Sequence, residues 1–161
     1  MVLTQVPRGL LSAASAGFFF ILVGTIFVTT PALIDGIVEL FRPDRIGTVQ
    51  VPNTVVYLPA PISPAAHLVI YQAVGLFSLV WGIFEIAMLM LRFSFHSPTS
   101  KKAENAGSIV FWLGTSYLIS VYLNETVTTT TWFVFWTTIL MLLGFSLIAR
   151  AAVLAIIRFA S

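Results

Sequence analysis

The sequence predicts an all-α membrane protein, with four transmembrane helices in an antiparallel bundle and a small extracytoplasmic cap that contains a β-hairpin. Two observations predict this fold class. Hydrophobic residues make up 58% of the 161 residues and charged residues only 9%, whereas soluble domains average about 45–50% and about 25%. The apolar residues also gather in windows of about 20 residues, the length that crosses a bilayer. We therefore expect one integral membrane domain over residues 1–161, and neither a soluble enzyme nor a nucleic-acid-binding protein.

Four windows are long and apolar enough to be helical spans. They cover residues 10–33, 65–91, 105–124 and 128–150, the last extended to about residue 159. The first window carries no charge, and the second carries one, Glu85. Very few residues separate the third window from the fourth, so these two helices must form an antiparallel hairpin.

The lysines and arginines predict the orientation, because they are enriched on the cytoplasmic side of membrane proteins. A cytoplasmic N-terminus places six of the eight on the inner side, namely Arg8, Arg92, Lys101, Lys102, Arg150 and Arg158. Only Arg42 and Arg45 then lie outside. We therefore expect a multi-pass protein of the cell membrane with both termini in the cytoplasm.

The two longer loops differ in character. In the outer loop, residues 35–64, the β-branched segments 48–51 and 54–58 flank Pro52 and Asn53, which predicts a small β-hairpin. Just before them, apolar residues at helical spacing from Ile34 to Phe41 predict a short helix at the membrane interface. The inner loop, residues 93–104, is short and basic, and we expect it to anchor the topology against anionic headgroups.

Glycines seven residues apart predict how the helices pack. Two helical turns separate the members of each pair, so both lie on one face. Membrane helices pack through such small residues because lipid is as apolar as leucine. The expected packing seam consists of Gly17, Gly24, Gly75, Ser78, Gly82, Gly107 and Gly114.

Glu85 is the only acidic residue well inside an expected span. A carboxylate that faces lipid costs about 2.5 kcal/mol or more, so such groups normally face protein and find a partner. Arg92 lies two turns later on the same helical face and is a candidate partner. Three roles stay open for Glu85: a hydrogen-bond or ion-pair partner that locks helices together, a proton or cation site, or a contact with another subunit.

A metal site is a weaker hypothesis. Asp35, Glu39 and His67 all lie near the outer ends of the first two expected spans, and carboxylates with a histidine can bind a divalent metal. The ordinary interpretation is surface charges beside a histidine near a helix start. The chain contains no cysteine, which excludes thiol catalysis and cysteine-ligated metals or clusters. We expect no cofactor.

Three function classes remain after these exclusions. The first is a non-catalytic accessory or structural subunit of a larger membrane complex, whose partners are lipid and other membrane subunits or copies of itself. The second is an oligomeric transporter or channel that uses Glu85 as its proton or cation site. The third is a membrane enzyme with an outer metal at Asp35, Glu39 and His67. The missing catalytic constellation favours the first class and makes an enzyme the less favoured interpretation.

Overall fold

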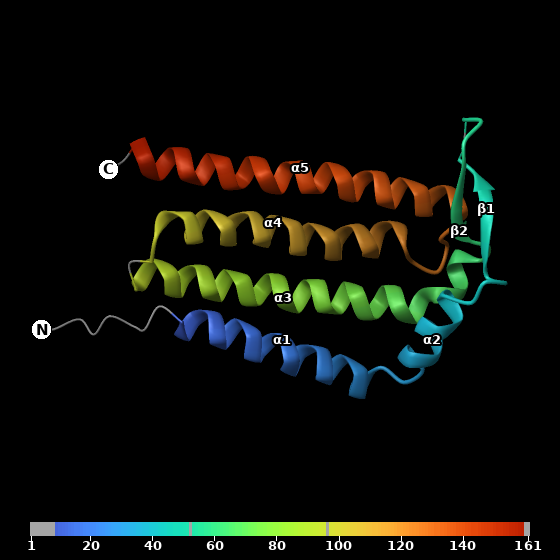
Figure 1. Ribbon diagram of the computed structural model, residues 1–161, viewed down its shortest axis with the longest axis horizontal. Coiled ribbons are helices and arrows are strands. Elements are labelled where there is room, and N and C mark those ends of the chain that lie inside the picture. Colours follow the sequence, from blue (N-terminus) through green and yellow to red (C-terminus); the bar gives the residue numbers. More distant parts are fainter. Residues whose placement is uncertain (1–8, 52, 96, 160–161) are drawn as a thin grey trace, which may run out of the picture.

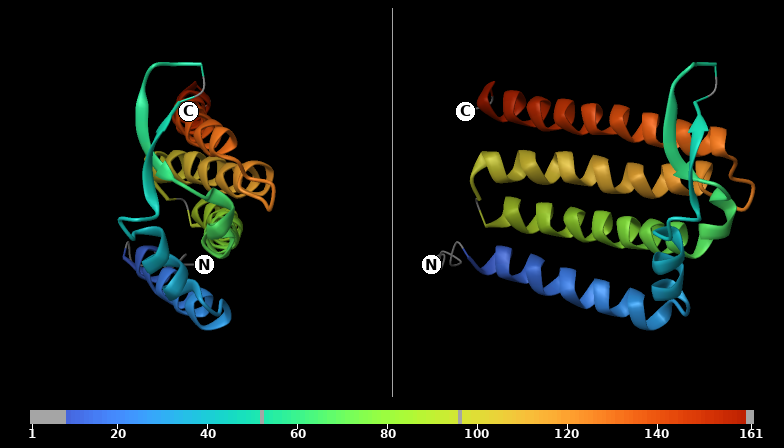
Figure 2. Two further views of the ribbon diagram at one scale, coloured as in Figure 1. Left: turned by 90° about the vertical axis from the view of Figure 1, so that its right-hand side faces the viewer. Right: turned by 45° about the vertical axis from the view of Figure 1, so that its right-hand side comes forward.

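The computed structural model describes residues 9–51, 53–95 and 97–159, and four long helices dominate them. These are α1 (Leu10–Thr29), α3 (Leu68–Ser94), α4 (Thr99–Tyr122) and α5 (Thr129–Phe159). They lie side by side and alternate in direction, as the sequence predicts for an antiparallel arrangement (Figure 1). The packing follows chain order, with α1 on α3, α3 on α4 and α4 on α5. The helices therefore form a row, with α1 and α5 at its two ends (Figure 2).

The smaller elements gather at one end of the helix axes, where α1 ends and α3 starts (Figure 1). They are α2 (Leu33–Leu40), β1 (Ile46–Gln50), β2 (Tyr57–Pro61) and the short 3-10 helix η1 (Pro64–His67). Strands β1 and β2 pair antiparallel, with Ile46 opposite Pro61 and Gln50 opposite Tyr57. The expected hairpin is thus confirmed, and it stands across the helix ends and reaches beyond α5 (Figures 1 and 2).

The hairpin turn follows from its residues. Asn53 has a φ of 61°, in the left-handed region that asparagine tolerates better than most residues. The Val51 N–H donates to the Val56 carbonyl at 2.9 Å, and the Thr54 N–H donates to the Val51 carbonyl at 3.1 Å. Residues suited to a tight turn therefore reverse the chain where the sequence predicts it.

Some helix ends differ from the expected ranges. The first expected span, 10–33, is interrupted because α1 ends at Thr29. Pro31 follows, and proline has no N–H with which to continue a helix. Ala32 then takes a φ of 64°, and α2 starts in a new direction at Leu33. Helix α4 starts at Thr99, six residues before the expected 105, with Pro98 as its N-cap residue. Proline has no backbone N–H and suits a helix start, where the N–H groups have no intrahelical partner.

Three helical segments of the described residues are long and apolar enough to cross a membrane. They are Leu10–Thr29, Pro64–Ser94 and Thr129–Phe159. These segments support the prediction that the chain is a membrane protein. Helix α4 has the length, 24 residues, but its first turns carry Lys101, Lys102 and Glu104 and its remainder is rich in small polar residues.

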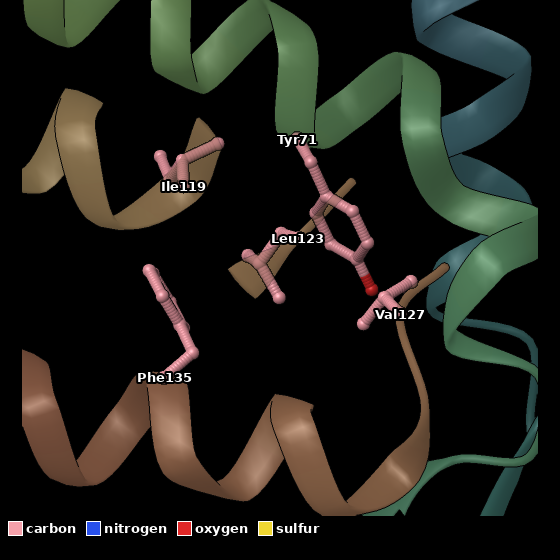
Figure 3. Close-up of a cluster of buried hydrophobic side chains, with 5 residues drawn as sticks. All are labelled: Tyr71, Ile119, Leu123, Val127 and Phe135. Carbon is pink, nitrogen blue, oxygen red and sulfur yellow. The ribbon is translucent and has the colours of Figure 1, made fainter. Parts of the chain in front are cut away.

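The buried residues form two apolar clusters. One joins α3, α4, the turn after α4 and α5, and consists of Tyr71, Ile119, Leu123, Val127 and Phe135 (Figure 3). The other joins α1, α2 and α3 through Leu22, Ile26, Leu33 and Ala73. Both clusters include residues near the helix ends that carry the hairpin, and they hold these helix ends together.

Candidate functional site

Glu85 lies on α3 and faces the start of α4. The Asn105 side-chain amide of α4 donates to the Glu85 carboxylate, and also to the Glu85 backbone carbonyl at 3.1 Å. Asn105 is only 3% exposed, and the Ser108 hydroxyl, also on α4, interacts with the same carboxylate. The only acid within the long apolar segments is therefore held by the neighbouring helix, as expected for an acid inside a membrane protein.

Arg92 has a different partner from the expected one. Its Nη1 donates to the Lys101 backbone carbonyl at 3.1 Å, which ties the end of α3 to the start of α4. None of the ion pairs between described residues joins Arg92 to Glu85, although the guanidinium charge still acts on that carboxylate through space. Arg92 therefore fastens the α3–α4 connection directly.

Four of the expected seam glycines lie in helix–helix contacts. Gly75 and Gly82 of α3 face α4, where a Cβ on Gly82 would lie 2.5 Å from Leu113. Gly107 and Gly114 of α4 face α5 instead, and a Cβ on Gly107 would lie 2.9 Å from the Ser146 carbonyl oxygen. Helix α4 is thus packed closely on both sides.

Polar side chains line the same contacts. Among the described residues, Ser78, Asn105, Thr115 and Ser146 are buried on α3, α4 and α5. The Ser78 hydroxyl donates to the Val74 carbonyl of its own helix at 2.7 Å. Small and polar residues between helices, with large apolar residues outside, are typical of packing within a membrane.

The expected seam on α1 is wrong for contacts within this chain. A Cβ on Gly17 or Gly24 would meet no atom of the described residues within 4 Å. Helix α1 turns large side chains toward α3 instead, and the Phe18 ring stacks on Phe84 at 4.0 Å between centroids. At 3.6 residues per turn, the glycines lie about 130° around the axis of α1 from Phe18 and Leu22, on another face of the helix.

The three candidate metal residues do not form a metal-binding group, although the Glu39 charge acts on His67. The Glu39 carboxylate pairs with Arg42 at 3.1 Å and with Arg45 at 2.8 Å, and its hydrogen bond raises the pKa of the Arg42 guanidinium above its usual value. Asp35 is exposed, whereas His67 is only 4% exposed. Within the described residues, no three histidine, aspartate or glutamate side chains are placed to hold a metal ion.

Asn105 is the site residue that sequence reasoning missed. Its signal is present in the sequence, because an amide at the edge of an apolar segment needs a hydrogen-bond partner. The short connection after Arg92 brings this amide back beside the last turns of α3, and Glu85 is the acid available there. Pairing the polar residues of adjacent apolar segments therefore finds this contact.

Comparison of the chain with protein-family models, curated proteins and solved structures finds no match.

Proposed function

We propose that this chain is a four-span membrane protein that serves as a non-catalytic subunit of a larger membrane complex. The observation that carries the proposal is the open small-residue face of α1, on which a Cβ at Gly17 or Gly24 would meet no atom of a neighbouring described element within 4 Å. Small residues in membrane helices let another helix approach closely. A partner helix that packs on this face gives these glycines the role that Gly82 and Gly107 have inside the chain.

The position of α4 supports its assignment as the fourth span. Helices α3 and α5 run in the same direction, and α4 lies antiparallel between them (Figure 1). If α3 and α5 both cross the bilayer, the chain between them must cross back. At 24 residues, α4 is about 36 Å long, enough for a hydrocarbon core of about 30 Å.

The lower hydropathy of α4 is consistent with this assignment. Neighbours pack on both sides of α4, whereas α1 and α5 each have one long helix beside them. A helix between two others presents less surface to lipid, so it can carry serine, threonine and glycine at little cost.

The charges at the two ends of the helix axes support the orientation with cytoplasmic termini. The end at which α1 starts and α5 stops carries five basic residues and one acidic residue among those described: Arg92, Lys101, Lys102, Arg150, Arg158 and Glu104. The opposite end carries Arg42 and Arg45 with four acidic residues: Asp35, Glu39, Asp44 and Glu125. The basic end belongs in the cytoplasm by the positive-inside rule.

The hydrogen bonds of Glu85 favour a structural role over transport. The carboxylate is bound by Asn105, and none of the other acidic residues of the described chain lies within the long apolar segments. A proton or cation pathway normally uses a chain of such groups. If transport were the function, Glu85→Gln would abolish pH-driven flux across vesicles that contain the purified protein. We expect no flux in the original chain, and a flux that this substitution removes would contradict the subunit proposal.

Purification from the native membrane in a mild detergent tests the proposal directly. We expect another polypeptide to copurify in stoichiometric amount, and Gly17→Leu to remove it. The matched control is Gly144→Leu on α5, because a Cβ at Gly144 also meets no described atom within 4 Å. A lone chain after purification, or a partner that both variants retain equally, would contradict the proposed use of α1.

A further inference from the structure

A groove of about 660 Å³ runs between α3 and α4 in the half of the row nearer the hairpin. On α3 it extends from Leu68 to Leu79, which is about 16 Å along the helix axis. This is about half of a hydrocarbon core of about 30 Å. With α3 and α4 both crossing the bilayer, the groove spans the outer leaflet and no more.

The groove has apolar side chains along its whole length, and its one charged residue, Glu125, lies at the outer end. Leu76, Leu79 and Ile119 line its deeper part together with Ser116, whereas Leu68 and Gln72 lie nearer the mouth. Leu76 is 47% exposed, so its side chain is open to the lipid. The lining therefore matches a molecule with an apolar chain inside the membrane and a polar group at the surface.

Glu125 determines which charge is favoured on the polar group of the bound molecule. It is exposed, and none of the ion pairs between described residues includes it. The outer arginines do not neutralise it, because Arg42 and Arg45 pair with Glu39 and Asp44. A carboxylate at the mouth of the groove therefore favours a cation there.

The Asn124 and Gln72 side chains near the mouth differ in whether they already form hydrogen bonds within the chain. The Asn124 amide donates to the Val121 carbonyl at 3.0 Å, and its oxygen accepts from the Thr126 hydroxyl at 2.7 Å. Both groups of Asn124 are therefore occupied within the turn. No hydrogen bond within the described chain engages the Gln72 side chain, so its amide can donate to a phosphate beside the cation.

We propose that the α3–α4 groove binds one membrane phospholipid with a primary-ammonium headgroup. The acyl chain lies along Leu76, Leu79 and Ile119, the ammonium pairs with Glu125, and the Gln72 amide donates to the phosphate. Phospholipids are the occupants present at the highest concentration in the outer leaflet, so a groove that opens sideways at this depth fills with them by mass action. A binding site of this volume lies within the range of about 300–1,000 Å³ found for small-molecule pockets.

The test measures the lipids that stay bound to the purified protein. The chain is reconstituted into vesicles with equal parts of phosphatidylethanolamine, phosphatidylcholine and phosphatidylglycerol, extracted in mild detergent and examined by native mass spectrometry. We expect one retained lipid, with phosphatidylethanolamine enriched about fivefold over phosphatidylcholine. Both headgroups carry a cationic group, but only the primary ammonium has N–H groups to donate to the Glu125 carboxylate, and about fivefold is the size of one net hydrogen bond. No retained lipid, or a preference for phosphatidylglycerol, would overturn the proposal.

Two variants separate the two halves of the site. Glu125→Gln should still retain a lipid but bring the enrichment to within about twofold of parity, and Asp35→Asn is its control because Asp35 is another exposed outer carboxylate outside the ion pairs. Leu76→Trp should fill the groove and remove the lipid, whereas Leu140→Trp on α5, at a position 70% exposed, should not. Equal retention by both tryptophan variants, or equal enrichment in both carboxylate variants, would contradict the assignment.

The inference rests on the four spans and the orientation of the proposed function, but it does not rest on the proposed protein partner. Lipid retention reports on α3 and α4, whereas recovery of a protein partner with Gly17→Leu reports on α1. Circular dichroism and a monodisperse gel-filtration peak confirm that each variant is folded before its lipids are counted.

Discussion

Gly107 is the residue at which backbone packing is tightest against another helix. A methyl group there would lie 2.9 Å from the Ser146 carbonyl oxygen, which is part of the α5 backbone and cannot rotate away. Side-chain neighbours can adjust by changing rotamer, whereas a backbone neighbour moves only with its helix. The α4–α5 contact therefore depends on this glycine more than on the side chains around it.

Gly107→Ala should lower the free energy of unfolding by about 1–3 kcal/mol, the usual cost of overpacking. Thermal unfolding in detergent measures this change. Gly144→Ala is the matched control, because its added methyl group meets no described atom within 4 Å. Equal melting temperatures for the two variants would show that α4 and α5 do not pack as described.

The Glu85–Asn105 contact predicts a loss of stability in a single variant and its recovery in a double variant. Asn105→Leu should cost about 1–3 kcal/mol, because it leaves the Glu85 carboxylate without its amide donor. Combining it with Glu85→Met should recover most of the loss, since replacing both polar partners by apolar groups of similar shape is close to neutral. Two single losses that simply add in the double variant would argue against a direct contact.

At the scale of elements, threonine side chains cap the start of α5. The Thr128 N–H donates to the Thr131 hydroxyl at 2.8 Å, and the Thr131 N–H donates to the Thr128 hydroxyl at 3.2 Å. These reciprocal bonds satisfy backbone donors that the helix cannot satisfy itself. The threonine-rich segment is therefore a helix cap.

Thr128→Ala should lower stability by about 0.5–2 kcal/mol, the usual effect of losing an N-cap. Thr130→Ala is the control, because Thr130 is exposed and its side chain makes none of the hydrogen bonds found at this helix start. Thermal unfolding of both variants checks the prediction, which fails if the control loses as much stability.

The sequence predicts the helices and the hairpin well because each has a local cause. Long apolar windows predict α1, α3 and α5. The β-branched segments around Asn53 predict the hairpin, although β2 (Tyr57–Pro61) starts three residues after the expected residue 54. Which neighbour a helix face meets is not a local property. The spacing of Gly107 and Gly114 is the same as that of Gly17 and Gly24, yet the first pair meets α5 and the second pair meets no described atom. The role of Asn105 could not be predicted for the same reason, because it depends on how α4 lies beside α3.

At the scale of the whole molecule, the two ends of the helix axes differ in charge, and the α1 and α5 sides of the row differ in how they pack. One end is basic and the other carries more acidic residues and the hairpin. Close packing through glycine holds α3, α4 and α5 together, whereas α1 joins them mainly through large side chains. These differences fit a protein whose two ends face different compartments and whose α1 side is available to a partner. The proposed topology requires that α4 crosses the membrane.

Cysteine labelling at the two ends of α4 tests this most directly, because the chain has no cysteine of its own. Ser100→Cys and Thr130→Cys place single thiols at exposed positions in the first turns of α4 and α5. In intact cells, a membrane-impermeant maleimide should label the Thr130→Cys variant and should reach the Ser100→Cys variant only after the membrane is permeabilised. Labelling of both variants from the same side would contradict a four-span protein.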